Sequence, residues 1–446
     1  MRKATLTIAA LAAATLVLSG CGSNASTSNT TTSAAGSAPA SVPASTAGGS
    51  SAGASSAGAS SAGASSAGAS SAGASSAGAS SGASSAGASS AGASSAGASS
   101  GGSSSPGTAG GAVNGKVGVI LPDTTSSTRY TLYDAPLLTA AFKTAGVDAD
   151  VQNAGGDVSK FTSIAQSMLG EGVKVLIMDS IDPASGAGVE ALAKKAGIQV
   201  IDYDRVNLGG SADYYVSFDN EAVGKLQGQT LVSCLDNAKM TDPQIIEMDG
   251  GTDVDNNAVL FKAGAQTVLS PLQTAGKLKV VSQNTVLGWD VTKAAPLFTQ
   301  ALTANGGKVD GVLAANDDIA NAVIGVLKGK GLAGKVQITG QDSGVEGLQN
   351  ILNGYQCMTV FKDVKKEAAA ASALAISLIK NGSPDSSGLT LSDFKDPKGN
   401  RTLKAVLLPA EAITIKNVQD VVKAGALTAA KICQGIEPKC TAAGVK

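Results

Sequence analysis

Polar side chains follow most of the short apolar runs in this sequence, and their types are those that bind hydroxyl groups. The run at Ile198–Ile201 is followed by Asp204 and Arg205, and the next run by Asp219 and Asn220. A carboxylate accepts hydrogen bonds, a guanidinium donates them and an amide does both, so together they complement a hydroxyl. Hydrogen bonds to charged groups are the stronger class. These residues predict a site for a small, uncharged ligand rich in hydroxyl groups.

The second half of the chain repeats this feature at Asp255 and Asn257, at Asn316, and at Asp342. Each of these residues has a simpler explanation, because Asp and Asn also cap helices by accepting hydrogen bonds from free N–H groups. For any single residue, capping is the better expectation. The same feature after nearly every predicted strand nevertheless favours one common site.

The elements that position these residues alternate between strands and helices. Amphipathic runs such as Phe161–Leu169, Val189–Ala196 and Ile319–Lys328 separate most of the predicted strands. The predicted strands are Lys116–Leu121, Ala149–Gln152, Val175–Met178, Ile198–Ile201, Tyr214–Phe218, Gln244–Met248, Lys279–Gln283, Gly311–Ala315, Gln337–Thr339 and Met358–Phe361. Such alternation predicts parallel sheets with helices on both faces, and ligands of these sheets bind beyond the carboxyl ends of the strands. Because residues 114–446 are more than a single hydrophobic core usually serves, we expect two α/β lobes.

The composition excludes several classes of function. The chain has 446 residues, a formal net charge of −1 and no histidine. A nucleic-acid surface needs a basic footprint. A Ser-His hydrolase needs histidine, and the lack of histidine also removes a favoured ligand of transition metals. Asp253-Val-Asp255-Asn-Asn257 begins like a calcium loop, but Ala258 stands where the turn glycine belongs. We therefore expect no nucleic-acid partner, no metal and no cofactor.

The N-terminal segment predicts export. Arg2 and Lys3 precede an apolar run to Leu18, which is typical of a secretion signal. The following Ser19-Gly20-Cys21 completes a sequence that resembles the bacterial lipobox, in which the cysteine is lipidated; the alternative is a plain signal peptide that happens to contain a cysteine. Lipid on Cys21 would anchor the protein to a membrane. Residues 1–20 are thus the predicted signal, and residues 21–113, rich in Ser, Ala and Gly, a disordered tether.

The remaining four cysteines are Cys234, Cys357, Cys433 and Cys440. Outside the cytoplasm they allow two disulfides in three connectivities. The short spacing favours Cys433 with Cys440, which leaves Cys234 with Cys357. The alternative is four separate buried thiols.

Several motifs, in order along the chain, resemble the periplasmic sugar-binding proteins of ABC importers. The motifs are Tyr203-Asp204-Arg205, Ser217–Glu221 with Gly224, Val254–Phe261, Ala301–Asn305, Asn316-Asp317 and Gly340-Gln341-Asp342. The resemblance covers about Lys116 to Lys423, and the xylose-binding members have the nearest pattern. It implies the type 1 periplasmic binding protein fold, with two Rossmann-like lobes joined by a three-segment hinge. The N-terminal lobe would hold residues 114–217 and 363–403, and the C-terminal lobe with the tail residues 218–362 and 404–446.

The resemblance also implies the ligand-binding residues. Those that bind hydroxyls would be Arg129, Asp204, Arg205, Asp255, Asn257, Asn316, Asp342 and Lys362, and the stacking aromatics Tyr130 and Trp289. Tyr130 departs from the xylose-binding pattern, which has a tryptophan there. The alternatives are a core position for Trp289, an ion pair between Asp204 and Arg205, and a solvated surface position for Lys362.

From this resemblance, together with the predicted lipidation of Cys21, we expect a monomeric, lipid-anchored protein that binds D-xylose or a similar aldose and delivers it to the membrane subunits of an ABC importer. One alternative is a sugar sensor that docks to a signalling receptor. Another is an enzyme that acts on glycosides through Asp204, Asp255 and Asp342. Because basic and amide side chains surround these acids, we expect them to be ionised rather than to have raised pKa values.

Overall fold

The computed structural model describes residues 115–446, so Cys21, the predicted signal and the predicted tether lie outside the described residues. The strands are β1 (Lys116–Leu121), β2 (Asp148–Asn153), β3 (Val175–Met178), β4 (Gln199–Tyr203), β5 (Tyr214–Phe218), β6 (Gln244–Asp249), β7 (Lys279–Thr285), β8 (Gly311–Ala314), β9 (Gln337–Ile338), β10 (Met358–Phe361), β11 (Ser392–Asp396), β12 (Arg401–Leu408) and β13 (Glu411–Thr414). The helices are α1 (Ala135–Ala145), α2 (Val158–Gly170), α3 (Pro183–Lys195), α4 (Asn220–Asn237), α5 (Asn256–Thr274), α6 (Ala294–Ala304), α7 (Asp317–Gly329), α8 (Val345–Asn353), α9 (Val364–Asn381), α10 (Val418–Lys423), α11 (Ala429–Cys433) and α12 (Glu437–Ala443). Short helical turns are η1 (Tyr130–Asp134), η2 (Leu287–Trp289), η3 (Val291–Lys293) and η4 (Asp385–Ser387).

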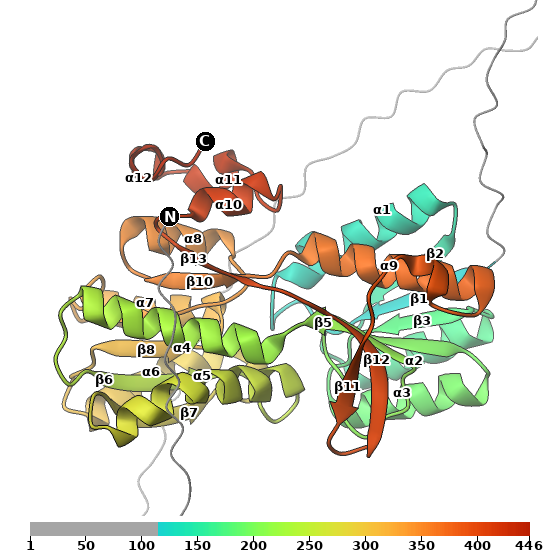
Figure 1. Ribbon diagram of the computed structural model, residues 1–446, viewed down its shortest axis with the longest axis horizontal. Helices are drawn as coiled ribbons and strands as arrows, with labels where there is room; N and C mark the ends of the chain where they lie inside the picture. Colours follow the sequence, from blue (N-terminus) through green and yellow to red (C-terminus); the bar gives the residue numbers. More distant parts are fainter. Residues whose placement is uncertain (1–114) are drawn as a thin grey trace, which may run out of the picture. The chain divides into compact units, whose positions relative to one another are not determined.

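The first lobe is built on a seven-stranded sheet in the order β11-β12-β5-β4-β3-β1-β2 (Figure 1). All neighbouring strands are parallel except β11, which pairs antiparallel with β12. Helices α1 and α9 bury Phe142 and Leu374 against one face, and α2 and α3 bury Phe161 and Val189 against the other. The predicted parallel sheet with helices on both faces is thus confirmed.

The second lobe has a parallel four-stranded sheet in the order β7-β6-β8-β9. Helices α4 and α5 cover one face through Leu231 and Leu269, and α6 and α7 cover the other through Phe298 and Val323. A separate antiparallel pair, β10 and β13, adjoins this lobe. The C-terminal helices α10 to α12 pack with α8 in a further apolar cluster.

The chain passes between the lobes three times: from β5 into α4, from β10 into α9, and from β12 into β13 (Figure 1). These crossings are the predicted three-segment hinge. The expected boundary after residue 403 is wrong, because it divides β12, whose Lys404–Leu408 pair with β5. The first lobe therefore extends through Leu408. The expected boundary after residue 217 lies one residue before the end of β5.

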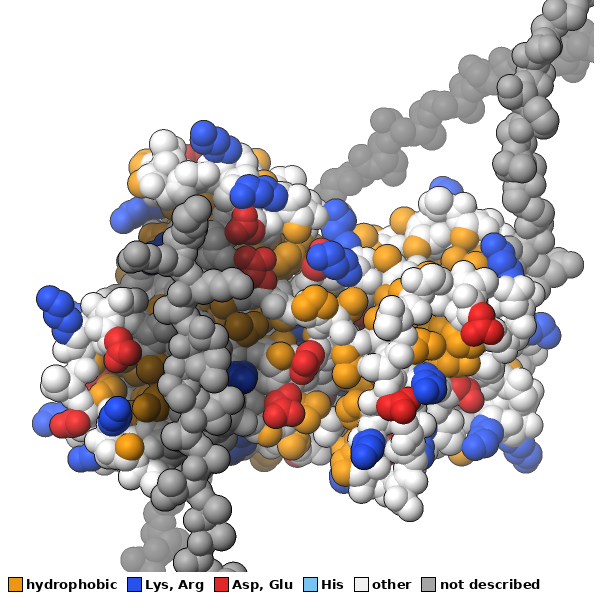
Figure 2. All heavy atoms as spheres, viewed as in Figure 1, with side chains coloured by type: hydrophobic (Ala, Val, Ile, Leu, Met, Phe, Trp, Pro, Cys, Tyr) orange, Lys and Arg blue, Asp and Glu red, His pale blue; other side chains and the backbone are white. Residues whose placement is uncertain are grey.

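Charged side chains of both signs are dispersed over the face of the molecule shown in Figure 2. This mixture agrees with the formal net charge of −1 for the whole chain. None of the helices within residues 115–446 is long and apolar enough to cross a membrane.

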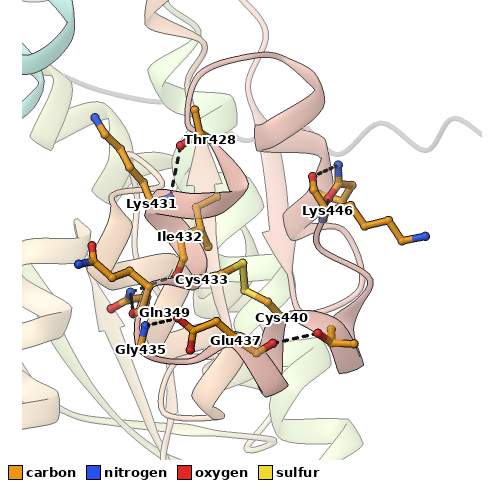
Figure 3. The surroundings of a disulfide bond; sticks show 12 residues. Gln349, Thr428, Lys431, Ile432, Cys433, Gly435, Glu437, Cys440 and Lys446 are labelled. Atoms are coloured by element: carbon orange, nitrogen blue, oxygen red, sulfur yellow. Dashed lines mark hydrogen bonds between the residues drawn. A yellow bond between two sulfur atoms is a disulfide. The ribbon is translucent and has the colours of Figure 1, made fainter.

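A disulfide fixes the C-terminal tail, which we define as residues 415–446. Cys433 of α11 is bonded to Cys440 of α12, with their Cα atoms 5.7 Å apart (Figure 3). The side-chain amide of Gln349, on α8, donates to the carbonyl oxygens of Ile432 and Gln434, both at 3.1 Å. The disulfide and these hydrogen bonds hold the tail against the second lobe.

The second disulfide joins Cys234 of α4 to Cys357, directly before β10, across a sequence separation of 123 residues. Both pairs are those that the spacing favoured. We expect the double variant Cys234→Ser, Cys357→Ser to lower the free energy of unfolding by about 4–5 kcal/mol, because the bond restricts a long loop in the unfolded chain. The double variant Cys433→Ser, Cys440→Ser opens a much shorter loop and should lose less. Urea unfolding without reductant measures both; equal losses would contradict the loop-length argument.

Candidate functional site

All ten residues predicted to bind the ligand line one cavity of about 310 Å³. The first lobe contributes Arg129, Tyr130, Asp204 and Arg205, and the second contributes Asp255, Asn257, Trp289, Asn316 and Asp342, with Lys362 from a crossing segment. The cavity thus lies between the lobes, at the carboxyl ends of their strands.

Arg129 and Asp204 form the centre of the first-lobe wall. The guanidinium of Arg129 donates to Asp204 Oδ1 at 2.9 Å, to Asp134 at 2.7 and 2.9 Å, and also to Glu367. The other Asp204 oxygen accepts from the Tyr130 hydroxyl at 2.9 Å. Arg129 thus pairs with three buried acids, and these hydrogen bonds fix the position of its planar guanidinium group.

The ionisation of Asp204 follows from these neighbours. Burial opposes its charge, but Arg129, Lys362 and Arg205 outweigh burial and lower its pKa to about 2. Glu367 behaves in the opposite way, since burial outweighs the attraction of Arg129 and raises its pKa to about 8. Asp204 is therefore a permanent acceptor at the cavity wall.

This low pKa predicts an acid-sensitive contribution to stability. A carboxyl group whose pKa is lowered on folding stabilises the folded state above its unfolded pKa, near 4, and loses that stabilisation as the pH falls toward 2. We expect about 2 kcal/mol of unfolding free energy to disappear in this window. Urea midpoints measured from pH 5 to pH 2.5 in wild type and in Asp204→Asn test this; identical slopes in the two proteins would contradict it.

Arg205 forms the adjacent part of the wall. Its guanidinium donates to the Ser126 hydroxyl at 3.0 Å, to the Tyr130 hydroxyl at 3.2 Å and to the Ser180 carbonyl at 3.3 Å. Its Nε lies 3.6 Å from Asp179 and from Asp255, and Asp255 belongs to the other lobe. The guanidinium carbons of Arg129 and Arg205 each lie 5.6 Å from the centre of the Tyr130 ring. Tyr130 therefore contacts two cations, which is more than the stacking role that the resemblance implied.

Trp289 closes the cavity from the second lobe. Its φ is 56°, a conformation that bulky residues rarely adopt. The indole lies against Gly250 and Gly251: a Cβ on Gly250 would lie 2.1 Å from ring atom Cη2. The Trp289 Nε1 donates to Asp255 Oδ2 at 3.1 Å, and Asp255 Oδ1 accepts from the Asn257 backbone N–H at 2.8 Å. Asp255 thus caps α5 and orients the indole.

Asn257 connects the two lobes. Its amide nitrogen donates to the Asp204 carbonyl oxygen at 2.8 Å. Its amide oxygen accepts from Asn220 at 2.8 Å and from the Tyr215 hydroxyl at 3.2 Å. Both ends of the amide therefore have protein partners, so the structure gives Asn257 an inter-lobe role beside the predicted role in ligand binding.

The remaining predicted residues also have protein partners. Asn316 caps α7 by accepting from the Ile319 N–H at 2.9 Å, so capping and cavity lining coexist. Lys362 lies 3.0 Å from Asp342 and is only 6% exposed. Its ammonium also lies 5.6 Å from the ring centre of Phe261. The alternative of a solvated surface lysine is therefore wrong.

The expectation that all the cavity acids keep low pKa values is wrong for Asp255. Its burial raises the pKa, although Arg205 acts in the opposite direction. The reason is that Asp255 has a single cation near it at 3.6 Å, whereas Asp204 has a direct bond to Arg129. Within residues 115–446, no group of three or more His, Cys, Asp or Glu is placed to hold a metal ion.

Sequence reasoning missed several residues of the site. Ser126, Ser127, Phe261 and Gln341 also line the cavity. Phe261 and Gln341 lie inside motifs that carried the resemblance, so a signal for them was present. The buried acids Asp134 and Glu367, which hold Arg129, had none, because each lies within a helical segment rather than directly after a strand.

Comparison with known proteins gives a consistent result. The family described as periplasmic binding protein domain matches residues 117–383. The D-xylose-binding periplasmic protein of Haemophilus influenzae is 37% identical over 277 residues, which are 62% of this chain and 80% of that protein. The protein of the same description from Escherichia coli is 36% identical over the same shares. A carbohydrate transporter solute binding protein from Chloroflexus aurantiacus, solved with D-glucose, is 28% identical, covers 71% of this chain and 97% of its own, and has a TM-score of 0.64.

Proposed function

The chain belongs to the family of periplasmic binding proteins, and from this premise we propose that it binds a monosaccharide, D-xylose or a similar aldose, and delivers it to an ABC importer. The observation that carries the proposal is that all ten residues that the sequence singled out line the same cavity between the lobes. As a member of this family the chain is a binding protein and not an enzyme. The acids of the cavity then serve as hydrogen-bond acceptors.

The mechanism follows from the two-lobed geometry. Asp204 and Arg205 offer an acceptor and a donor from one lobe, while Asn316 and the Lys362–Asp342 pair offer polar groups from the other side. A sugar that bonds to both walls stabilises the closed arrangement, which is a shift of population and needs no covalent step. Trp289 supplies the flat apolar surface for the C–H face of the ring. The importer subunits would then recognise the closed protein.

The choice of D-xylose is supported by the relatives at 37% and 36% identity, whose names state that sugar. A thermal-shift screen against pentoses, hexoses and polyols tests it. We expect the largest rise in melting temperature with D-xylose, because a ligand that binds only the folded state stabilises it by mass action. A larger shift with D-glucose would move the proposal to that sugar, and no shift with any sugar would refute sugar binding. Recovery of unchanged sugar after long incubation is also expected.

We further propose that lipid on Cys21 anchors the protein and that it acts as a monomer. The motif Leu18-Ser19-Gly20-Cys21 supports the anchor. In a bacterial host, Cys21→Ser should move the protein from the membrane fraction to the soluble fraction, with sugar affinity unchanged because the cavity lies in residues 126–362. A Ser19→Ala protein serves as the control that should stay in the membrane fraction. Membrane retention of Cys21→Ser would refute the anchor.

A further inference from the structure

A second, larger cavity of about 550 Å³ adjoins the first one. The two cavities share four lining residues: Ser127, Arg129, Asp342 and Lys362. These residues therefore stand between the two cavities, and a group on a bound sugar would have to pass between them to reach the second cavity.

The walls of the second cavity are mainly apolar. The first lobe supplies Tyr133 and Leu137, the crossing segment supplies Phe361, and the tail supplies Val421 and Leu427. Tyr133 also packs against the apolar cluster that α8 forms with the tail. The tail, held by the Cys433–Cys440 bond, thus forms one side of this cavity, and the first lobe forms the other.

The cations that line this cavity already have partners. Arg129 is bonded to Asp134, Asp204 and Glu367. Lys362 is paired with Asp342 at 3.0 Å. Lys365 donates to the carbonyl oxygens of Ala424 and Gly425 at 3.5 and 3.0 Å. An anionic group would therefore have to displace an existing partner, whereas an uncharged apolar group would gain by leaving water.

From this arrangement we propose that the protein takes monosaccharides with an uncharged apolar substituent, as in an alkyl or aryl glycoside, with the sugar ring in the first cavity and the substituent in the second. The inference rests on the proposed function, because it needs a sugar in the first cavity. It also assigns a role to the tail, as the wall that contacts the substituent. Since the first lobe and the tail both line this cavity, the substituent would add to the contacts that hold the lobes closed.

The test compares D-xylose and D-glucose with the α- and β-butyl glycosides of each, by isothermal titration calorimetry. We expect at least one butyl glycoside to bind about tenfold more tightly than its parent sugar, because the butyl chain is transferred from water to an apolar wall. The variant Ala426→Phe, which fills the second cavity from the tail, should remove this gain and leave the affinity for the parent sugar within about twofold. Leu137→Trp, which fills the cavity from the first lobe, should do the same and guards against a folding defect in either variant.

The matched control is Ala430→Phe, because Ala430 is an exposed residue of the tail that does not line the cavity. It should keep the butyl gain in full. If a parent sugar binds but no butyl glycoside binds more tightly, or if the gain persists in both filled variants, this inference is overturned and the proposed function stands. If neither D-xylose nor D-glucose nor any of their glycosides binds, the proposed function fails and the inference fails with it.

Discussion

Asp204→Ala is expected to weaken monosaccharide binding by about 300-fold. The change removes a carboxylate held ionised by Arg129, with a pKa of about 2, from the wall of the cavity. A hydrogen bond from a hydroxyl to a charged group contributes about 1.5–3 kcal/mol, and a sugar hydroxyl that loses this acceptor inside the cavity also pays the cost of an unpaired buried donor. Arg129 keeps Asp134 and Glu367, so we expect the melting transition to stay cooperative. Isothermal titration calorimetry with D-xylose measures the change.

Two further variants make the result interpretable. Asp204→Asn keeps the shape and loses only the charge, so its affinity should fall between those of wild type and Asp204→Ala. Asp157→Asn changes an exposed aspartate that caps α2 by accepting from the Lys160 N–H, outside the cavity, and should bind like wild type. Wild-type affinity in Asp204→Ala would remove this residue from the site.

Trp289→Ala is expected to weaken sugar binding by about 100-fold. The indole is the flat apolar surface of the second lobe in the cavity, and it packs edge-on against Phe261 with ring centres 6.5 Å apart. Truncation removes that surface and leaves Asp255 without its indole donor. A loss of about 3 kcal/mol corresponds to this fold-change, since each 1.4 kcal/mol is a factor of ten. Calorimetry is again the measurement.

Trp289→Phe separates the two contributions of the indole. It keeps a flat ring but not the Nε1–H donor, so we expect a loss of about tenfold. Trp289 is also the only tryptophan in the chain, and its fluorescence in wild type should therefore change on titration with the sugar. Equal affinities in Trp289→Ala and wild type would place the stacking surface elsewhere.

The parallel part of the fold and the residues of the cavity were predictable from the sequence for the same reason. Buried parallel strands such as Val175–Met178 and Gly311–Ala314 are continuous apolar runs, and in such sheets the residues that follow the strands gather at one edge. Asp204 follows β4 and Asn316 follows β8 in this way. The position of a functional residue is therefore set by where its strand ends.

The strands β11, β12 and β13 were missed because they lack this signature. β11 has the sequence Ser-Asp-Phe-Lys-Asp and is mostly exposed at the edge of its sheet, and β12 begins with Arg401-Thr-Leu-Lys. Their pairing depends on contacts far along the chain, which local patterns do not reveal. The same limit applies to Asn257, whose partners Asn220 and Tyr215 come from α4 and β5. The pKa of Asp255 likewise depends on the balance between its burial, which raises the pKa, and its distance from Arg205, which lowers it.

The place of β12 in the first sheet has a consequence for biogenesis. This strand lies between β5 and β11, yet it is made from residues 401–408, near the end of the chain. A polypeptide synthesised from its N-terminus thus exposes the edge of β5 until almost the whole chain has been made. The first lobe can complete its sheet only after residues 401–408 have been added, so a chaperone that shields an open sheet edge would act during that interval.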